Sequence, residues 1–196
     1  MRRLCSSFRY AAALRQGCSC DSGTQIAEFA LSLPLLVLFV VGIFDFSGAI
    51  TLKQKLTNAA REGARVAAAD PANDLGNTGK GAAVPVSAVD AYYVVDNYLL
   101  AEKINDCGLS GSTTPAVSAP LTWTYTSNGS GCPGVGITLT INRGCITQQS
   151  GTDFVNTCVT IQYPYKWKFG AVAGVLGSTF VGPTRITTTA VAFNEN

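Results

Sequence analysis

The stretch that decides the architecture is Gly23–Phe46, GTQIAEFALSLPLLVLFVVGIFDF. Residues 29–44 are apolar except for Ser32, and weaker apolar character continues as far as Leu52. The whole run has about 24 residues, which is near the span that a bilayer requires. Glu28 lies just inside this run. A carboxylate costs free energy in hydrocarbon, so Glu28 requires a functional explanation.

The helical pattern continues past the apolar run through LKQKLTNAAREGARVAAAD, residues 52–70, which is rich in strong helix formers. It ends at Asp70, because Pro71 disfavours helix at the residue before it. One helix over residues 24–69 would be about 69 Å long at 1.5 Å per residue. Its second half is therefore expected to leave the bilayer and carry a domain.

Small residues recur at a spacing of four in this second half. A smooth face of this kind permits close approach by a sheet or another helix. The alternative interpretation is that alanine is simply a good helix former. The two rows are Ala59, Gly63 and Ala67, and Ala60, Ala64 and Ala68.

Residues 70–196 are expected to form a small α+β domain outside the membrane. Asp70 to Pro85 is rich in Gly, Asn and Pro and is predicted to be a loop. Ser87–Ile104 is predicted to be a helix with Ser87 as its N-cap. The apolar stretch Trp167–Gly182 is too short to cross a membrane. We expect it to be a loop covering the core, with a partner-facing surface as the alternative.

Four segments of this domain alternate apolar side chains with threonines or other polar residues. Such alternation predicts strands with one packed face and one outward face, here rich in threonine. No crossover helices separate the segments, so we expect an antiparallel sheet of about four strands. The segments are residues 121–126, 137–141, 159–163 and 185–193.

The composition argues against several classes of protein. The chain has no histidine, the commonest general base and the commonest transition-metal ligand. It has no Walker-type phosphate loop. Its net charge is only +2, without a basic cluster, which argues against a nucleic-acid partner. We therefore expect no enzyme, no catalytic residue, no metal site and no cofactor.

The seven cysteines fall into two groups: three precede the apolar run and four follow it. If the run crosses a membrane, the second group faces an oxidising compartment, where four cysteines suggest two disulfides. Three pairings are possible. We favour Cys145–Cys158, which closes a hairpin loop, and this leaves Cys107–Cys132. Buried free thiols are the alternative.

Charge and processing signals bear on how the run is used. Four arginines precede it and little positive charge follows immediately, which favours an N-in, C-out orientation. Residues 47–49, Ser-Gly-Ala, offer a secretory cleavage site as an alternative. Cleavage there would leave Glu28 and Pro34 without a role.

A cut after Gly23 would instead make Glu28 the fifth residue of the mature chain, followed by Phe29. Glycine, an acid five residues later and then an aromatic residue before an apolar helix resemble the prepilin processing site of type IV pilins. AEFALSLPLLVLFVVGIFDF and NAAREGARVAAA resemble the TadE-like family of tight-adherence (Tad/Flp, type IVc) pilus assembly proteins. The close resemblance covers residues 23–69. VTIQYPYKW and the threonine-rich last strand are similar to the family's usual ending.

The resemblance implies that a prepilin peptidase cuts the Gly23–Thr24 bond on the cytoplasmic side and removes leader 1–23. Residues 29–52 would span the bacterial inner membrane in the precursor, and the mature chain would reach a periplasmic or cell-surface pilus. Glu28 of one subunit would pair with the Thr24 amine of its neighbour. The implied partners are the peptidase, other pilin subunits and the inner-membrane assembly platform. Major subunits of this system are very small, so this longer chain would be a minor pilin or pseudopilin.

Two further residues of the apolar run have expected roles. Asp45 lies 17 residues after Glu28, about 26 Å along a helix, so the two acids bracket most of a hydrocarbon core about 30 Å thick. We expect Asp45 at the outer interface, either solvated or paired with a basic residue of a neighbour. Pro34 removes one helix hydrogen bond and is expected to kink or loosen the helix. The candidate partners of Asp45 are Lys53, Arg61 and Arg65.

Two rival functions remain open. The chain could be an uncleaved single-pass membrane protein whose outer domain binds a ligand or acts as an adhesin without polymerising, with the threonine face as a glycan-binding surface. It could also be a secreted binder or enzyme released after Ala49. The first rival predicts an uncut chain and tolerance of a neutral residue at Glu28.

Overall fold

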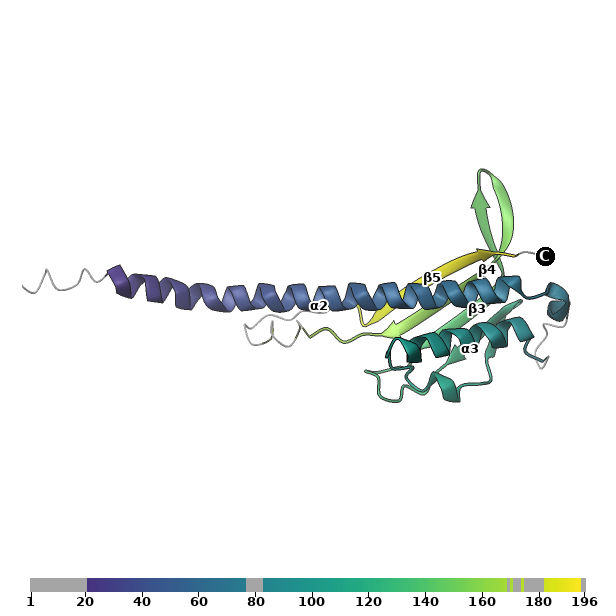
Figure 1. Cartoon of the computed structure of the whole chain (residues 1–196), viewed down its shortest axis with the longest axis horizontal. Helices are drawn as coiled ribbons and strands as arrows, with labels where there is room; N and C mark the ends of the chain where they lie inside the picture. The colour runs from purple at the N-terminus through teal and green to yellow at the C-terminus, as the bar shows by residue number, and fades with distance from the viewer. Residues whose placement is uncertain (1–20, 77–82, 169, 171–173, 175–181, 195–196) are drawn as a thin grey trace, which may run out of the picture. The chain divides into compact units, whose positions relative to one another are not determined.

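The computed structural model describes residues 21–76, 83–168, 170, 174 and 182–194. The chain divides into two compact units, with the boundary between Ile43 and Phe44. Within these residues two helices, two short 3-10 helices and five strands are assigned, which confirms the α+β class (Figure 1). In chain order they are α2 (Asp21–Ala69), η1 (Ala72–Gly76), α3 (Val86–Ala101), η2 (Leu109–Gly111), β1 (Ala116–Ala119), β2 (Thr122–Thr126), β3 (Thr138–Gln149), β4 (Thr152–Pro164) and β5 (Arg185–Phe193).

Helix α2 confirms the long helix that the sequence predicts. It begins three residues earlier than expected, at Asp21, and ends at Ala69, directly before Asp70 and Pro71. The Asp70 amide still donates to the Val66 carbonyl at 3.2 Å, which completes the last turn. The second half of α2 belongs to the unit that begins at Phe44.

The sheet is an antiparallel meander in the order β1-β2-β3-β4-β5. The prediction of about four strands missed β1, because its sequence AVSA is short and mostly exposed. Strands β3 and β4 also exceed the predicted segments. They continue past an irregularity between Asn142 and Cys145 and meet at the turn of Ser150 and Gly151, where both φ angles are positive. Positive φ at both positions is typical of a tight two-residue hairpin turn.

The two faces of the sheet differ as the alternation predicts. One face is packed, and the other carries one threonine from each of β2 to β5 in a single cross-strand row. Hydroxyl contacts link neighbours in this row at 3.4 Å between β2 and β3 and 2.9 Å between β4 and β5. The row consists of Thr124, Thr140, Thr160 and Thr189. The packed face is formed by Trp123, Tyr125, Leu139, Ile141, Val159, Ile161 and Ala190.

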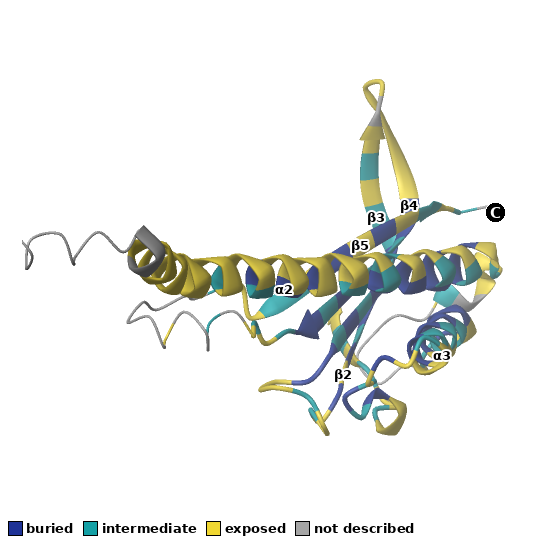
Figure 2. Ribbon diagram, turned by 60° about the vertical axis from the view of Figure 1, so that its left-hand side comes forward, coloured by how far each residue is buried: buried dark blue, intermediate teal, exposed yellow. Residues whose placement is uncertain are grey.

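The second half of α2 and helix α3 supply much of the rest of the core, together with Ile104, Cys107, Leu109 and Ile137 (Figure 2). All six small residues of the two predicted rows are buried. A Cβ added at Gly63 would lie 2.7 Å from Val95 Cγ2 and 3.5 Å from the Ala91 carbonyl oxygen, both on α3. The small residues therefore permit close packing, beyond any contribution to helix propensity.

Gly63→Val tests this packing. The added side chain must displace Val95, and overpacking of this kind typically costs about 1–3 kcal/mol. We expect the substitution to lower the free energy of unfolding by that amount, measured by chemical denaturation of the full chain in detergent. The Ala69→Val variant is the control, because Ala69 is exposed on the same helix. Equal stability of the two variants would contradict the close packing.

Helix α3 departs from its prediction at both ends. Pro85, and not Ser87, is the N-cap residue, and no side chain caps the helix. The Pro85 carbonyl accepts the amides of Ala88 and Val89, while Ser87 is buried in the first turn. The helix ends at Ala101, since Lys103 adopts a φ of 56°.

Helix α3 also buries an acid. Asp96 is 6% exposed, and its Oδ1 has no hydrogen-bond partner among the described residues. Burial, and secondly the charge of Asp106, raise the pKa of Asp96. A raised folded-state pKa means that this group's stabilisation is present below the unfolded pKa, near 4, and is lost as pH rises through the folded pKa.

Asp96→Asn should therefore stabilise the domain at pH 7, because it replaces a buried carboxylate by a neutral amide of the same shape and removes the cost of burying the charge. It should also shrink the stability difference between pH 7 and pH 4. Asp106→Asn is the matched control with the opposite sign, because Asp106 accepts backbone amides of Gly108 and Ser110. Thermal unfolding at both pH values measures the effect, and a destabilised Asp96→Asn protein at pH 7 would contradict it.

The structure describes only part of each of the two predicted loops. Asp70–Pro85 contains the short helix η1, which lies in the predicted loop, and residues 77–82 lie outside the described residues. Most of Trp167–Gly182 also lies outside them, so its expected role as a loop over the core stays a prediction.

Candidate functional site

The first candidate surface is the apolar part of α2 in the unit that ends at Ile43. Its large apolar side chains point into solvent: Phe29 is 64% exposed and Leu31 is 81% exposed. Figure 2 shows this part of the helix almost entirely in the colour of exposed residues. By length and composition alone, α2 is apolar enough to cross a membrane. A continuous exposed apolar surface of this length requires lipid or protein to cover it.

Glu28 lies on this apolar surface with its side chain exposed. The ion pairs within the described part of the chain are Lys55–Glu102 and Arg65–Glu62, so Glu28 has no cationic partner there. Because the Glu28 side chain is exposed, a group that lies outside the described residues can reach its carboxylate. The neighbouring Phe29 is exposed as well.

The predicted cleavage bond and the predicted kink both lie within α2. Gly23 and Thr24 are in its first turn. The helix continues through Pro34 without interruption, although proline cannot donate to the Ala30 carbonyl. The kink or loosening expected at Pro34 stays a prediction, as does cleavage after Gly23.

Asp45 differs from the expectation of a solvated residue. It is 5% exposed, and the Tyr165 hydroxyl donates to its Oδ1 at 3.0 Å and to its backbone oxygen at 3.2 Å. Burial, and secondly the hydrogen bond to Asp45, raise the pKa of Tyr165. Asp45 therefore fixes the segment after β4 to helix α2. This contact lies within the unit that begins at Phe44.

Aromatic rings extend this contact. The Trp167 ring lies tilted against the Phe46 ring, with ring centroids 5.2 Å apart. The Tyr165 ring lies edge-on to Trp167, with centroids 5.0 Å apart. The Trp167 indole donates to the Pro183 carbonyl at 2.7 Å. The sequence prediction missed this cluster. Its only signal is the alternation of aromatic residues and lysines in YPYKWK, residues 163–168.

Two disulfides join the four cysteines of the described residues, paired as the sequence analysis favours. Cys107 is joined to Cys132 with Cα atoms 5.4 Å apart, and Cys145 to Cys158 at 5.9 Å. Cys107 is fully buried in the core cluster, whereas Cys145 is half-buried at the base of the β3–β4 hairpin. The hairpin location agrees with the reason for favouring that pair.

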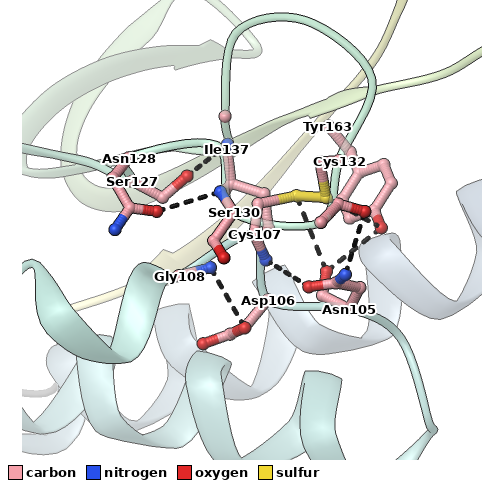
Figure 3. The surroundings of a disulfide bond; sticks show 12 residues. Asn105, Asp106, Cys107, Gly108, Ser127, Asn128, Ser130, Cys132, Ile137 and Tyr163 are labelled. Atoms are coloured by element: carbon pink, nitrogen blue, oxygen red, sulfur yellow. Dashed lines mark hydrogen bonds between the residues drawn. A yellow bond between two sulfur atoms is a disulfide. The ribbon is translucent and has the colours of Figure 1, made fainter.

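The loop around the first disulfide is held by short polar contacts (Figure 3). The Cys107 amide donates to Asn105 Oδ1 at 2.8 Å, and Tyr163 donates to the Asn105 carbonyl at 3.1 Å. Burial alone would raise the pKa of Asp106, but amide donors from Ser110 and Gly108 outweigh it and hold the pKa below its usual value. These contacts stabilise the loop, and no ligand-binding chemistry follows from them.

The described part of the chain holds no group of three or more Cys, Asp or Glu side chains that could bind a metal ion.

Residues 23–65 match the family model described as TadE-like protein. The search of curated proteins and the search of solved structures returned no match. The family match confirms the resemblance over a segment that carries Gly23, Glu28 and the small-residue rows as far as Ala64. It implies involvement in the assembly of the tight-adherence pilus.

Proposed function

From the match of residues 23–65 to TadE-like proteins, we propose that this chain is a minor pilin or pseudopilin of a tight-adherence pilus or secretion system. A prepilin peptidase cuts it after Gly23, and it joins other subunits through α2. The observation that carries the proposal is Glu28, exposed and without a cationic partner among the described residues, at the fifth position of the mature chain.

The mechanism is a charge pairing between subunits. Cleavage creates an α-amine on Thr24, which is largely cationic near neutral pH. An uncompensated carboxylate in apolar surroundings is costly, so Glu28 gains most when docking brings a neighbour's amine to it. The pair then selects the axial register of the helices more than it adds raw stability.

In this proposal the apolar surface of α2 is covered in two different environments. Before cleavage, residues 29–52 span the inner membrane with the N-terminus in the cytoplasm. After cleavage, the assembly platform moves the chain into a bundle in which neighbouring helices replace lipid. The exposed side chains of Phe29 and Leu31 support a surface that is covered in both states.

The disulfide-bonded domain, residues 70–196, works outside the membrane. Its two disulfides support an oxidising compartment, since such bonds persist in the periplasm and at the cell surface. Its size, relative to the small major subunits of such systems, supports a minor subunit.

Sheared surface fibres test the proposal. The chain should be present in the fibre fraction of cells that have the prepilin peptidase and absent from the fibre fraction of cells that lack it. A chain that stays in the membrane fraction of both strains would contradict the proposal.

One observation favours the second candidate, an anchored binding or adhesin domain. The outward sheet face presents the ordered hydroxyl row of Thr124, Thr140, Thr160 and Thr189, which suits a polar ligand such as a glycan. An uncut chain at the membrane would favour this candidate over the pilin.

A further inference from the structure

An apolar groove of about 260 Å³ lies between α2 and the start of β5, within the unit that begins at Phe44. Its helical wall follows the spacing i, i+3, i+4, i+7 and is therefore one face of α2. The volume is below the roughly 300–1,000 Å³ of a pocket for a whole small molecule. The groove thus suits part of a slender apolar chain. Its lining residues include Phe46, Ala49, Ile50 and Lys53 on α2, Trp167 after β4, and Arg185 and Ile186 at the start of β5.

The groove lies where the apolar run of α2 ends. Ile50 follows Glu28 by 22 residues, about 33 Å of helix, and the hydrocarbon core is about 30 Å thick. With Glu28 at the inner headgroups, Ile50 reaches the outer ones. The groove then opens at the depth where acyl chains meet headgroups. Trp167 and Tyr165 are the residue types enriched at this depth.

The charges around the groove favour an anion. Arg185 lines it and donates to Gln162 Oε1 and to the Gly136 carbonyl, so Lys53 is the lining cation left for a ligand. Lys53 is exposed and forms no ion pair within the described part of the chain. It also lines an adjoining groove together with Arg61. Lys166 and Lys168 flank Trp167 in the sequence and are exposed. The nearby acid, Asp45, is buried and accepts the Tyr165 hydroxyl.

We propose that this groove binds one anionic phospholipid of the outer leaflet of the inner membrane. An acyl chain lies against Phe46, Ile50 and Trp167, and Lys53 contacts the phosphate. The lipid holds the base of the domain at the membrane before assembly. The proposal rests on insertion of α2 into a membrane and not on cleavage or polymerisation.

Fluorescence quenching tests the site in the full, uncleaved chain reconstituted into phosphatidylethanolamine nanodiscs. Brominated phosphatidylglycerol or brominated phosphatidylcholine is added at the same low mole fraction. The chain has two tryptophans, and Trp123 is 2% exposed in the core, so Trp167 supplies the lipid-sensitive signal. We expect at least twofold stronger quenching by the glycerol lipid, and loss of the quenching in Trp167→Phe.

Lys53→Gln should abolish the preference for the glycerol lipid while the fold is unaffected, because Lys53 is exposed. Lys55→Gln is the matched control: it changes the same charge two residues away, where Lys55 pairs with Glu102 at 3.0 Å, and should keep the preference. Equal quenching by both lipids, or a preference that survives Lys53→Gln, would overturn the lipid site. Absence of quenching by either lipid would overturn it too and leave the groove for a neighbouring subunit's helix. No peptidase is present, so these failures are separable from failure of the pilin proposal.

Discussion

Glu28→Ala should leave cleavage after Gly23 intact and remove the chain from the fibre. The substitution takes away the carboxylate that would meet the neighbour's Thr24 amine, and that amine would remain uncompensated in an apolar bundle. Breaking a buried pair on one side typically costs about 3–5 kcal/mol. At 1.4 kcal/mol for each factor of ten, this corresponds to a loss of incorporation of at least about a hundredfold. Quantitative immunoblots of sheared fibres and membranes measure it.

Two controls make this result specific. Glu28→Gln keeps the shape of the side chain and should fail as Glu28→Ala does, since the charge is the cause. Glu62→Gln removes a carboxylate from the same helix, where it pairs with Arg65, and should be incorporated normally. Normal incorporation of Glu28→Ala would contradict the pairing, even if the chain proved to be a fibre component.

The Cys107→Ala/Cys132→Ala double variant should lose the most stability of any change in the folded domain. The bond closes a loop with a sequence separation of 25, and loop-closure entropy gives about 3.5 kcal/mol for that length. Cys107 is also fully buried, so its truncation leaves a void in the core. In a chain of this size the melting temperature should fall by about 7–14 °C.

Removal of the other bond provides the comparison. Cys145–Cys158 has a separation of 13, for which the same relation gives about 2.9 kcal/mol, and its cysteines are only half-buried. The second double variant should therefore be the more stable of the two. Thermal unfolding of the oxidised proteins measures both. A Cys107→Ala/Cys132→Ala protein as stable as the unmodified chain would show that the bond does not support the core.

The sequence was sufficient where the signal is local and periodic. The long helix, the alternation in β2 to β5 and the small-residue rows all follow from spacing along a few turns or strands. β5 was predicted at its observed bounds, Arg185–Phe193, because it is bounded by loop residues and alternates throughout. The roles of Gly23, Thr24, Glu28 and Phe29 rest on the family match, and their chemistry stays a proposal.

What the sequence could not provide are contacts between distant segments. The bond between Asp45 and Tyr165 joins residues 120 positions apart, and no spacing rule links them. Ser87 is a residue type that is common at N-caps, but the N-cap is Pro85, two residues earlier, whose carbonyl accepts the amides of Ala88 and Val89. β1 was missed because it gains its order from pairing with β2, which its own four residues do not indicate.

The most direct test of the central claim is the N-terminus and intact mass of the chain, isolated from membranes of cells with and without the prepilin peptidase. The proposal predicts that the chain begins at Thr24 when the peptidase is present and is uncut when it is absent. An uncut chain in both strains would contradict the pilin function and favour the anchored binding domain. A chain that begins at Ile50 would contradict both, because the apolar part of α2 with Glu28 would then be discarded.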